Sequence, residues 1–198
     1  FSMPGMMDTV LNLGLNDESV QGLIAQTGNE RFAWDSYRRF IQMFSNVVLG
    51  VDGDEFENAI NIKKRETGVK QDTELSASDL KDLVEVFKGI VAHEVSAEEY
   101  PSLVVDGKVA FPQDAEKQLH LAIEAVFSSW NNRRACDYRR MEKIPDDIGT
   151  AVNVQTMVLG NTGETSATGA GFTRNPADGT RECYGDFHHH ALGDGVVA

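Results

Sequence analysis

The spacing of apolar residues changes near residue 150, and this change restricts the chain to a fold that mixes helices with antiparallel strands. Before that point apolar residues recur every three to four positions, most regularly over residues 32–48, as in an amphipathic helix. After it, short β-type runs alternate with turn residues at 151–159, 169–173 and 184–189, and Val196 opens a fourth run. Helices followed by an antiparallel β-meander predict an α+β domain.

Capping and helix-breaking residues predict where the helices of the first part begin and end. Asp17 is placed to cap a first helix, and Gly50 should end the long one. Ser76 and Asp79 have the spacing of a capping box, which predicts another helix after them. Pro112 is expected to open a further helix. The buried stripe of that helix should consist of Leu119, Ile123, Val126, Phe127 and Trp130.

The negative charge of the chain argues against some classes of binding partner. Its 198 residues carry a formal net charge of -13, so nonspecific attraction to nucleic acid or to an anionic membrane is not expected. An acidic protein still binds ATP where backbone amides, a few cations and a metal ion hold the phosphates. No apolar run approaches the ~20 residues that span a bilayer. Cys136 and Cys183 are too few for a disulfide framework and favour reduced thiols in the cytoplasm.

A loop near the start of the chain has residues suited to binding phosphate. It runs from Ser2 to Thr9 as Ser-Met-Pro-Gly-Met-Met-Asp-Thr. Gly5 is flexible enough to let backbone N–H groups approach phosphate oxygens, and Thr9 could donate to the same oxygens. No Gly-Lys-Ser/Thr follows, which excludes a Walker loop. Residue types alone favour a structural loop, so both interpretations stay open.

Positive charge is concentrated in a second block. Five basic residues stand within eleven positions, from Arg133 to Lys143, in an otherwise acidic chain. Such a cationic patch suits an anion such as a polyphosphate. The alternative, which composition favours, is a solvated helix end where arginines pair with nearby aspartates and the helix dipole.

The third block, Gly149–Val158, has alternating valines and ends in Gln-Thr-Met-Val. Met157 and Val158 could cover the two faces of an adenine ring, while backbone groups at a strand edge bond its polar edge. A plain core strand is the alternative, and it is the one that residue types alone favour.

Taken together, these blocks resemble one family. Eight strings occur in order between Ser2 and Asp186, namely SMPGMMDT, LNLGLND, YRRFIQMF, FPQD, SWNN, YRRMEKIPDD, GTAVNVQTMV and FTRNPADG. No one string is specific, but the ordered set resembles the ATP-grasp nucleotide-binding domain of the pyruvate, phosphate dikinase family. Water dikinases such as phosphoenolpyruvate synthase share that architecture and are less similar in these strings.

The resemblance implies a role for each block. The N-terminal loop would cover the ATP phosphates, an arginine of the YRRF string would help to bind them, and the third block would form the adenine hinge. The implied nucleotide-binding residues are Ser2, Gly5, Thr9, Arg38, Arg39, Gln155, Met157 and Val158. Asp186 falls where the family has a glutamate that holds Mg²⁺. The implied division is a phosphate-loop segment with helices at 1–50, a helical subdomain at 51–112, with a loop at 94–112, and an ATP-grasp β-rich part at 113–198.

The resemblance also implies a reaction and its partners. Family members transfer the β,γ-phosphates of ATP to a histidine on a separate domain. Inorganic phosphate takes one phosphoryl group, and pyruvate takes the other in a C-terminal barrel, which gives AMP, pyrophosphate and phosphoenolpyruvate. The expected cofactors are therefore ATP and Mg²⁺. The expected partners are the phosphohistidine and pyruvate-binding domains, with a homodimer for the full-length protein and a plastid or other organelle as a second possible location.

The end of the chain departs from the family pattern. The family reads Tyr-Gly-Glu-Phe, two apolar residues and Asn-Ala-Gln, whereas this chain has Asp186 for the glutamate and His190 for the asparagine. A strand would place His188 and His190 on one side. Because imidazole favours Zn²⁺, Cu²⁺ or Ni²⁺ over Mg²⁺, one hypothesis is a metal site at Asp186 and His190 with altered preference. An incidental histidine tract is the alternative.

Two other functions stay open from the sequence. One is a related dikinase that acts on water or a small molecule, and the other is a non-catalytic nucleotide-binding module. The sequence contains no phosphohistidine motif and no pyruvate barrel, and it begins at Phe1 in an expected loop and ends in the apolar run Val196–Ala198. We therefore expect a piece of a longer polypeptide that is inactive alone.

Overall fold

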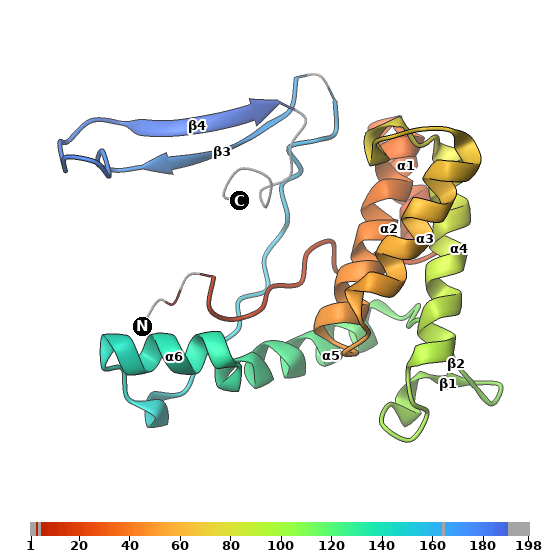
Figure 1. Ribbon diagram of the computed structural model, residues 1–198, viewed down its shortest axis with the longest axis horizontal. Helices are drawn as coiled ribbons and strands as arrows, with labels where there is room; N and C mark the ends of the chain where they lie inside the picture. Colours follow the sequence, from red (N-terminus) through yellow and green to blue (C-terminus); the bar gives the residue numbers. More distant parts are fainter. Residues whose placement is uncertain (1–2, 4, 164, 190–198) are drawn as a thin grey trace.

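The computed structural model describes residue 3 and residues 5–163 and 165–189, and it confirms the α+β prediction (Figure 1). The α-helices are α1 (Ser19–Thr27), α2 (Glu30–Val47), α3 (Gly53–Thr67), α4 (Ala77–Glu94), α5 (Ala115–Ser128) and α6 (Arg133–Glu142). The strands are β1 (Val104–Val105), β2 (Lys108–Val109), β3 (Ala167–Phe172) and β4 (Tyr184–His189). Short 3-10 helices are η1 (Asp72–Glu74), η2 (Pro101–Leu103), η3 (Ser129–Asn131) and η4 (Asp146–Ile148). Helices α1 to α4 form one group, and α5 and α6 run one after the other away from it.

The core of the helical group lies between α2, α3 and α4 and contains several aromatic rings in contact. Phe40 and Phe44 of α2 meet Phe111 edge-on, with ring centroids 5.7 and 5.6 Å apart. Phe56 of α3 meets Phe87 of α4 in the same way at 4.9 Å. Burying a side chain of this size stabilises a fold by roughly 1.5–3 kcal/mol. The apolar stripe predicted for α2 is therefore confirmed as the centre of the core.

The capping box predicted before α4 is present. Ser76 Oγ accepts from the amide of Asp79 at 3.2 Å, and the Asp79 carboxylate accepts from the amide of Ser76 at 2.9 Å. The cap predicted for α1 is wrong, because Asn16 and not Asp17 accepts from the amide of Ser19, at 2.7 Å. The carboxylate of Asp17 is used elsewhere and accepts from Tyr37 and Lys88. Residue type alone does not distinguish the two, because both are good capping residues.

Helix α5 differs from its prediction at its start and in its buried side. It begins after Asp114, whose side chain accepts from an amide of the first turn at 2.8 Å, and not at Pro112. Its buried residues are Gln118 and Ala122, whereas the predicted stripe is only half-buried and Phe127 is 46% exposed. The helix therefore turns a polar side chain inward, for a reason that the contacts of Gln118 explain below.

Within the loop predicted for residues 94–112, the structure forms a short hairpin at residues 104–109. Val104 pairs with Val109 across β1 and β2. Asp106 and Gly107 form the turn between them with φ values of 51° and 78°. Both angles lie in the left-handed region that a type I′ hairpin turn requires, and Asp-Gly is a preferred pair for it. The dipeptide was a usable hairpin signal, but the two strands are too short to show an alternating pattern.

The β-rich second part is smaller than predicted. Strands β3 and β4 form an antiparallel hairpin with Ala167 opposite His189 and Phe172 opposite Tyr184, which confirms two of the expected strands. Residues 151–159 were expected to form another and do not. A strand needs a partner for its backbone groups, and the described residues place none beside this segment. The strand expected from Val196 lies outside the described residues.

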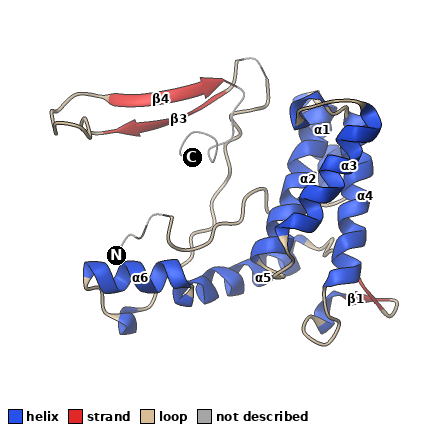
Figure 2. Cartoon of the chain, viewed as in Figure 1, coloured by secondary structure: helices blue, strands red, loops and turns tan. Residues whose placement is uncertain are grey.

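The β3–β4 hairpin stands apart from the helices (Figure 2). Every residue of β4 is exposed, whereas Thr168 and Ala170 of β3 are half-buried. Among the described helices, none has the length and apolar character needed to cross a bilayer.

Candidate functional site

The N-terminal segment, residues 5–16, is held along α5 and α6 by polar contacts at its start. The amide of Asp8 donates to Ser129 Oγ at 3.0 Å, and Asn132 Nδ2 donates to the carbonyl oxygen of Met6 at 3.1 Å. Arg134 pairs with the Asp8 carboxylate at 3.1 Å. The segment is therefore a loop bonded to residues more than a hundred positions away in the sequence. Loops that carry a functional site are often held in place in this way by the rest of the fold.

A buried glutamine holds the other end of this segment. Gln118 of α5 is fully buried, and its Oε1 accepts from the amide of Gly14 at 3.0 Å. Its Nε2 donates to the carbonyl oxygens of Leu15 and Pro112 at 3.0 and 2.7 Å. These three bonds supply partners for one buried and two part-buried backbone groups. The inward position of Gln118 follows from this task.

Methionine sulfur atoms contact the middle of the segment. The amides of Leu11 and Asn12 donate to Met43 Sδ and Met157 Sδ, at N–S distances of 3.2 and 3.4 Å. The start of the block Gly149–Val158 is joined to the loop as well, because the Thr150 hydroxyl donates to Met7 Sδ at 3.4 Å. The structure thus brings the first and third sequence blocks together, although they are separated by more than 130 residues.

The structure describes two of the three predicted phosphate-binding residues of the loop. Gly5 and Thr9 are exposed. Gly5 has a φ of 72°, in the left-handed region that favours glycine. Ser2 lies outside the described residues. The two described residues are therefore accessible to a ligand.

A cleft of about 540 Å³ opens between this loop, α2 and the start of α3. Leu11 and Asn12 form its loop side, and Arg38 and Arg39 are among the side chains of α2 that line it. Arg39 is 39% exposed, so its guanidinium can meet an anion that enters. The side chain of Arg38 is only 3% exposed and serves mainly the interior.

Arg38, Arg39 and Asp35 form a charged cluster on α2. Arg38 Nη2 lies 2.6 Å from Asp35 Oδ1, and Arg39 Nε lies 3.0 Å from Asp35 Oδ2. Asp72 stands 3.9 Å from Arg38 as a second counter-charge. Burial raises the pKa of the Asp35 carboxyl, but the charges of the two arginines and their hydrogen bonds outweigh it and hold the pKa below its ordinary value.

This depressed pKa predicts a pH dependence of stability. Ionised Asp35 stabilises the fold fully above its ordinary pKa of 3.8, and this contribution is lost as the pH falls through the lower folded value. We therefore expect the free energy of unfolding to fall more steeply below about pH 4 in the native chain than in Asp35→Asn. Urea titrations at a series of pH values measure both curves, and parallel curves would contradict the prediction.

The predicted adenine residues do not line an enclosed pocket among the described residues. Met157 is half-buried against Asn12, whereas Gln155 is exposed and Val158 is 92% exposed. Val154 is 64% exposed as well. The exposed apolar side chains of this segment are available to a flat ring. The described residues do not enclose such a ring.

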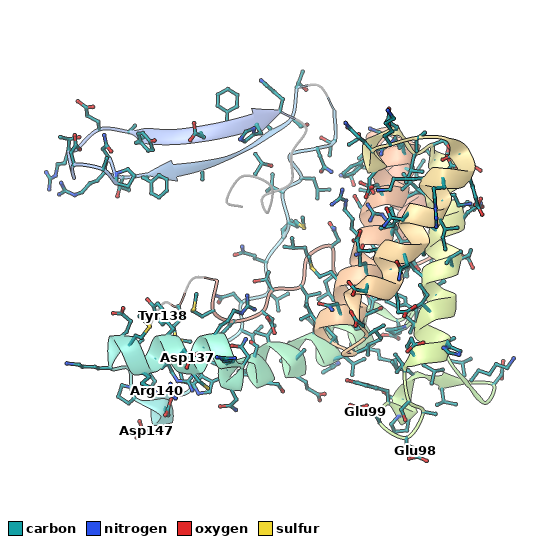
Figure 3. All side chains as sticks on the ribbon, viewed as in Figure 1. Glu98, Glu99, Asp137, Tyr138, Arg140 and Asp147 are labelled. Carbon is teal, nitrogen blue, oxygen red and sulfur yellow. The ribbon has the colours of Figure 1, made fainter. Side chains whose placement is uncertain are left out.

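The second block is partly structural. Arg139 lies 4.0 Å from the ring centroid of Trp130, donates to the carbonyl oxygen of Trp130, and pairs with Asp146 at 2.6 Å. Arg140 instead pairs with Asp137 on the exposed side of α6 (Figure 3). The cationic block therefore divides into one interior arginine and several surface ion pairs, as in the solvated alternative.

The predicted metal residues are only partly described. Asp186 is exposed on β4 opposite Ala170, and strand alternation puts it on the same side as Tyr184 and His188. His190 lies outside the described residues. Within the described ranges, no group of three His, Cys, Asp or Glu side chains could hold a metal ion.

Two residues of the site escaped sequence reasoning. Gln118 carries a signal in hindsight, because it stands four positions before Ala122 on the buried side of an amphipathic helix. Met43 carries none, because a methionine at helical spacing looks like any core residue.

Comparison with known proteins covers the whole chain. The family model described as "Pyruvate phosphate dikinase, AMP/ATP-binding domain" matches residues 1–198. The chain is 55% identical over 197 residues to pyruvate, phosphate dikinase of Clostridium symbiosum, covering 100% of this chain and 21% of that protein. It is 54% identical over 197 residues to the chloroplastic enzyme of Mesembryanthemum crystallinum (100% and 19%) and 53% over 199 residues to that of Giardia intestinalis (100% and 21%). The chain thus spans about a fifth of the length of the curated relatives it matches.

Proposed function

The chain belongs to the family of pyruvate phosphate dikinase AMP/ATP-binding domains, and from this premise we propose that it supplies part of the ATP site of a pyruvate, phosphate dikinase-like phosphotransferase. The observation that carries the proposal is the family match over residues 1–198. The contacts that join the N-terminal loop to residues 150 and 157 support it, because two blocks assigned to one nucleotide lie side by side.

In this proposal the loop and Arg39 meet the phosphates. Gly5 and Thr9 are exposed, and Arg39 is the more accessible guanidinium of the cleft, able to bond phosphate oxygens with two N–H groups. Arg38 pairs with Asp35 and fixes its carboxylate, which in turn orients Arg39. Gln155, Met157 and Val158 are the adenine side, with Met157 fixed against the loop and Val158 free to cover a ring face. Ser2 completes the predicted set.

The reaction proposed for the parent enzyme is ATP, phosphate and pyruvate to AMP, pyrophosphate and phosphoenolpyruvate, through a phosphohistidine on another domain. Phosphoryl transfer is catalysed mainly by positioning and by neutralising charge, and this chain's share is to position the nucleotide. The phosphohistidine and pyruvate-binding domains are the proposed partners, and a homodimer is the proposed state of the full-length protein. The division at 1–50, 51–112 and 113–198 is proposed with it, as is a location in the cytoplasm or an organelle.

Mg²⁺ is the proposed metal. Mg²⁺ commonly binds through one or two carboxylates and takes its other oxygens from substrate phosphates and water. Asp186 offers one such carboxylate, and the described residues add no second beside it. Asp186 therefore fits as the one carboxylate ligand to a Mg²⁺ ion held chiefly by phosphates. His190 is the second ligand in the alternative proposal, a site with altered metal preference. ATP titrations in the presence of Mg²⁺ or Mn²⁺ test the metal preference. A Mg²⁺ affinity like that of the family would rule out an altered preference.

Calorimetry tests the nucleotide site. We expect Arg39→Ala to weaken ATP binding about tenfold, because it removes one charge-assisted contact to phosphate. Arg140→Ala, which removes a more exposed arginine on α6 outside the cleft, should bind as the native chain does. Equal affinities in both variants would contradict the assignment of Arg39.

Calorimetry with ATP, together with assays of AMP formation and phosphate consumption, distinguishes the rival functions in the longer parent protein. Binding with no AMP formed would favour a non-catalytic nucleotide module, and AMP formed without phosphate consumption would favour a water dikinase. No binding of ATP to the parent protein would overturn the proposal altogether.

A further inference from the structure

Thioether sulfur atoms hold two consecutive amides of the N-terminal loop. Met43 Sδ of α2 accepts from the amide of Leu11 at 3.2 Å, and Met157 Sδ accepts from the amide of Asn12 at 3.4 Å. The two sulfurs come from residues 114 positions apart in the sequence and meet the loop at adjacent residues. A thioether is a weak acceptor, and sulfur is also the atom of these side chains that oxidants attack.

We propose that Met43 and Met157 are oxidation sites through which a peroxide releases residues 11 and 12 of the loop. The proposal does not depend on the nucleotide site, because it concerns the attachment of the loop and not its ligand. Both methionines are half-buried and not sealed in the core. Met43 also lines the cleft of about 540 Å³ beside Leu11 and Asn12, which gives a molecule as small as hydrogen peroxide a way in.

The reaction is a two-electron oxidation at sulfur. The sulfur lone pair attacks one oxygen of a hydroperoxide, an S–O bond forms, and the O–O bond breaks. The second oxygen takes up a proton and leaves, as water when the oxidant is hydrogen peroxide. The thioether becomes a sulfoxide, which is more polar and carries an additional oxygen.

Oxidation removes the hold of either sulfur on the loop. N–S distances of 3.2 and 3.4 Å leave no room for an oxygen on the lone pair that faces the amide, so the oxygen forms on the second lone pair of the sulfur. The oxidised sulfur is electron-poor and no longer accepts from the amide N–H, so the loop loses this contact. Asn12 has a φ of 58°, a left-handed conformation that is unfavourable without supporting contacts. Loss of the sulfur contact therefore favours a change of backbone conformation at Asn12.

Residue-resolved hydrogen exchange after peroxide treatment tests the proposal, with peptide mass spectrometry to locate each sulfoxide. We expect the amides of Leu11 and Asn12 to exchange about tenfold faster once Met43 and Met157 are oxidised, and to recover after treatment with methionine sulfoxide reductases. Met141 is 79% exposed on α6 and should be oxidised first without effect on the loop.

Matched variants separate this effect from general oxidative damage. Met141→Leu should respond to peroxide as the native chain does, whereas the double variant Met43→Leu, Met157→Leu should not respond. An equal response in the double variant, or unchanged exchange despite sulfoxide at both positions, would overturn the proposal. So would intact thioethers at Met43 and Met157 under peroxide that converts Met141 completely and continues to act. If the double variant does not fold, hydrogen exchange of the native chain before and after oxidation tests the proposal by itself.

Discussion

Asp35→Ala is expected to lower the free energy of unfolding by about 3–5 kcal/mol, the typical cost of removing one partner of a buried ion pair. The guanidinium of Arg38 is 3% exposed and depends on Asp35 at 2.6 Å, with Asp72 more distant at 3.9 Å. Its Nε is already buried without an acceptor among the described residues. Removing the carboxylate would leave a buried charge poorly compensated at the centre of α2.

Arg39→Ala is the control for this variant, because it removes the exposed partner of the same carboxylate. A surface ion pair contributes about 0–1 kcal/mol, so this variant should unfold in urea nearly as the native chain does. A loss in Asp35→Ala no larger than in Arg39→Ala would show that Arg38 is not held by Asp35. Together with the ATP titration, the pair distinguishes an arginine that supports the fold from one that meets a ligand.

Gln118→Leu is expected to lower the free energy of unfolding by about 3 kcal/mol, because one buried and two part-buried backbone hydrogen bonds would lose their partner. Leucine has a similar volume, so the cost comes from hydrogen bonds and not from a cavity. The groups affected are the amide of Gly14 and the carbonyls of Leu15 and Pro112. The attachment of the N-terminal loop should weaken with them.

Urea unfolding measures the loss, and hydrogen exchange at Gly14 reports on the loop itself. Glu124→Gln, an exposed substitution on the same helix, should change neither quantity. Unchanged exchange at Gly14 in Gln118→Leu would mean that the loop does not depend on this bond, whatever happens to global stability.

Local patterns accounted for much of the fold. The helical spacing of residues 32–48 and the Ser76 capping box both reappear in the structure, because they depend on residues within one or two turns of each other. The same holds for β3 and β4, whose turn residues stand between them in sequence. The family resemblance, which depends on ordered strings and not on geometry, was confirmed by the comparisons.

Patterns that depend on distant partners were misjudged. The run 151–159 has the alternation of a strand, but alternation describes only which face is apolar and cannot supply a neighbouring strand. Asp17 and Asn16 are equally good caps by residue type, and the structure uses Asn16 for the amide of Ser19 while Asp17 pairs with Lys88 of α4. The ATP-binding and metal roles given to Ser2, Asp186 and His190 stay predictions.

The sequence by itself determined the family, the α+β class and most of the helices, because these are recorded in local spacing and in the order of short strings. Only the tertiary structure decided how the N-terminal loop is held, since the bond from Gln118 to Gly14 and that from Asn12 to Met157 join residues 104 and 145 positions apart. It also decided that Arg38 faces inward and Arg39 outward, although the two are neighbours. Burial and partners belong to the packed molecule, and no residue type or spacing states them in advance.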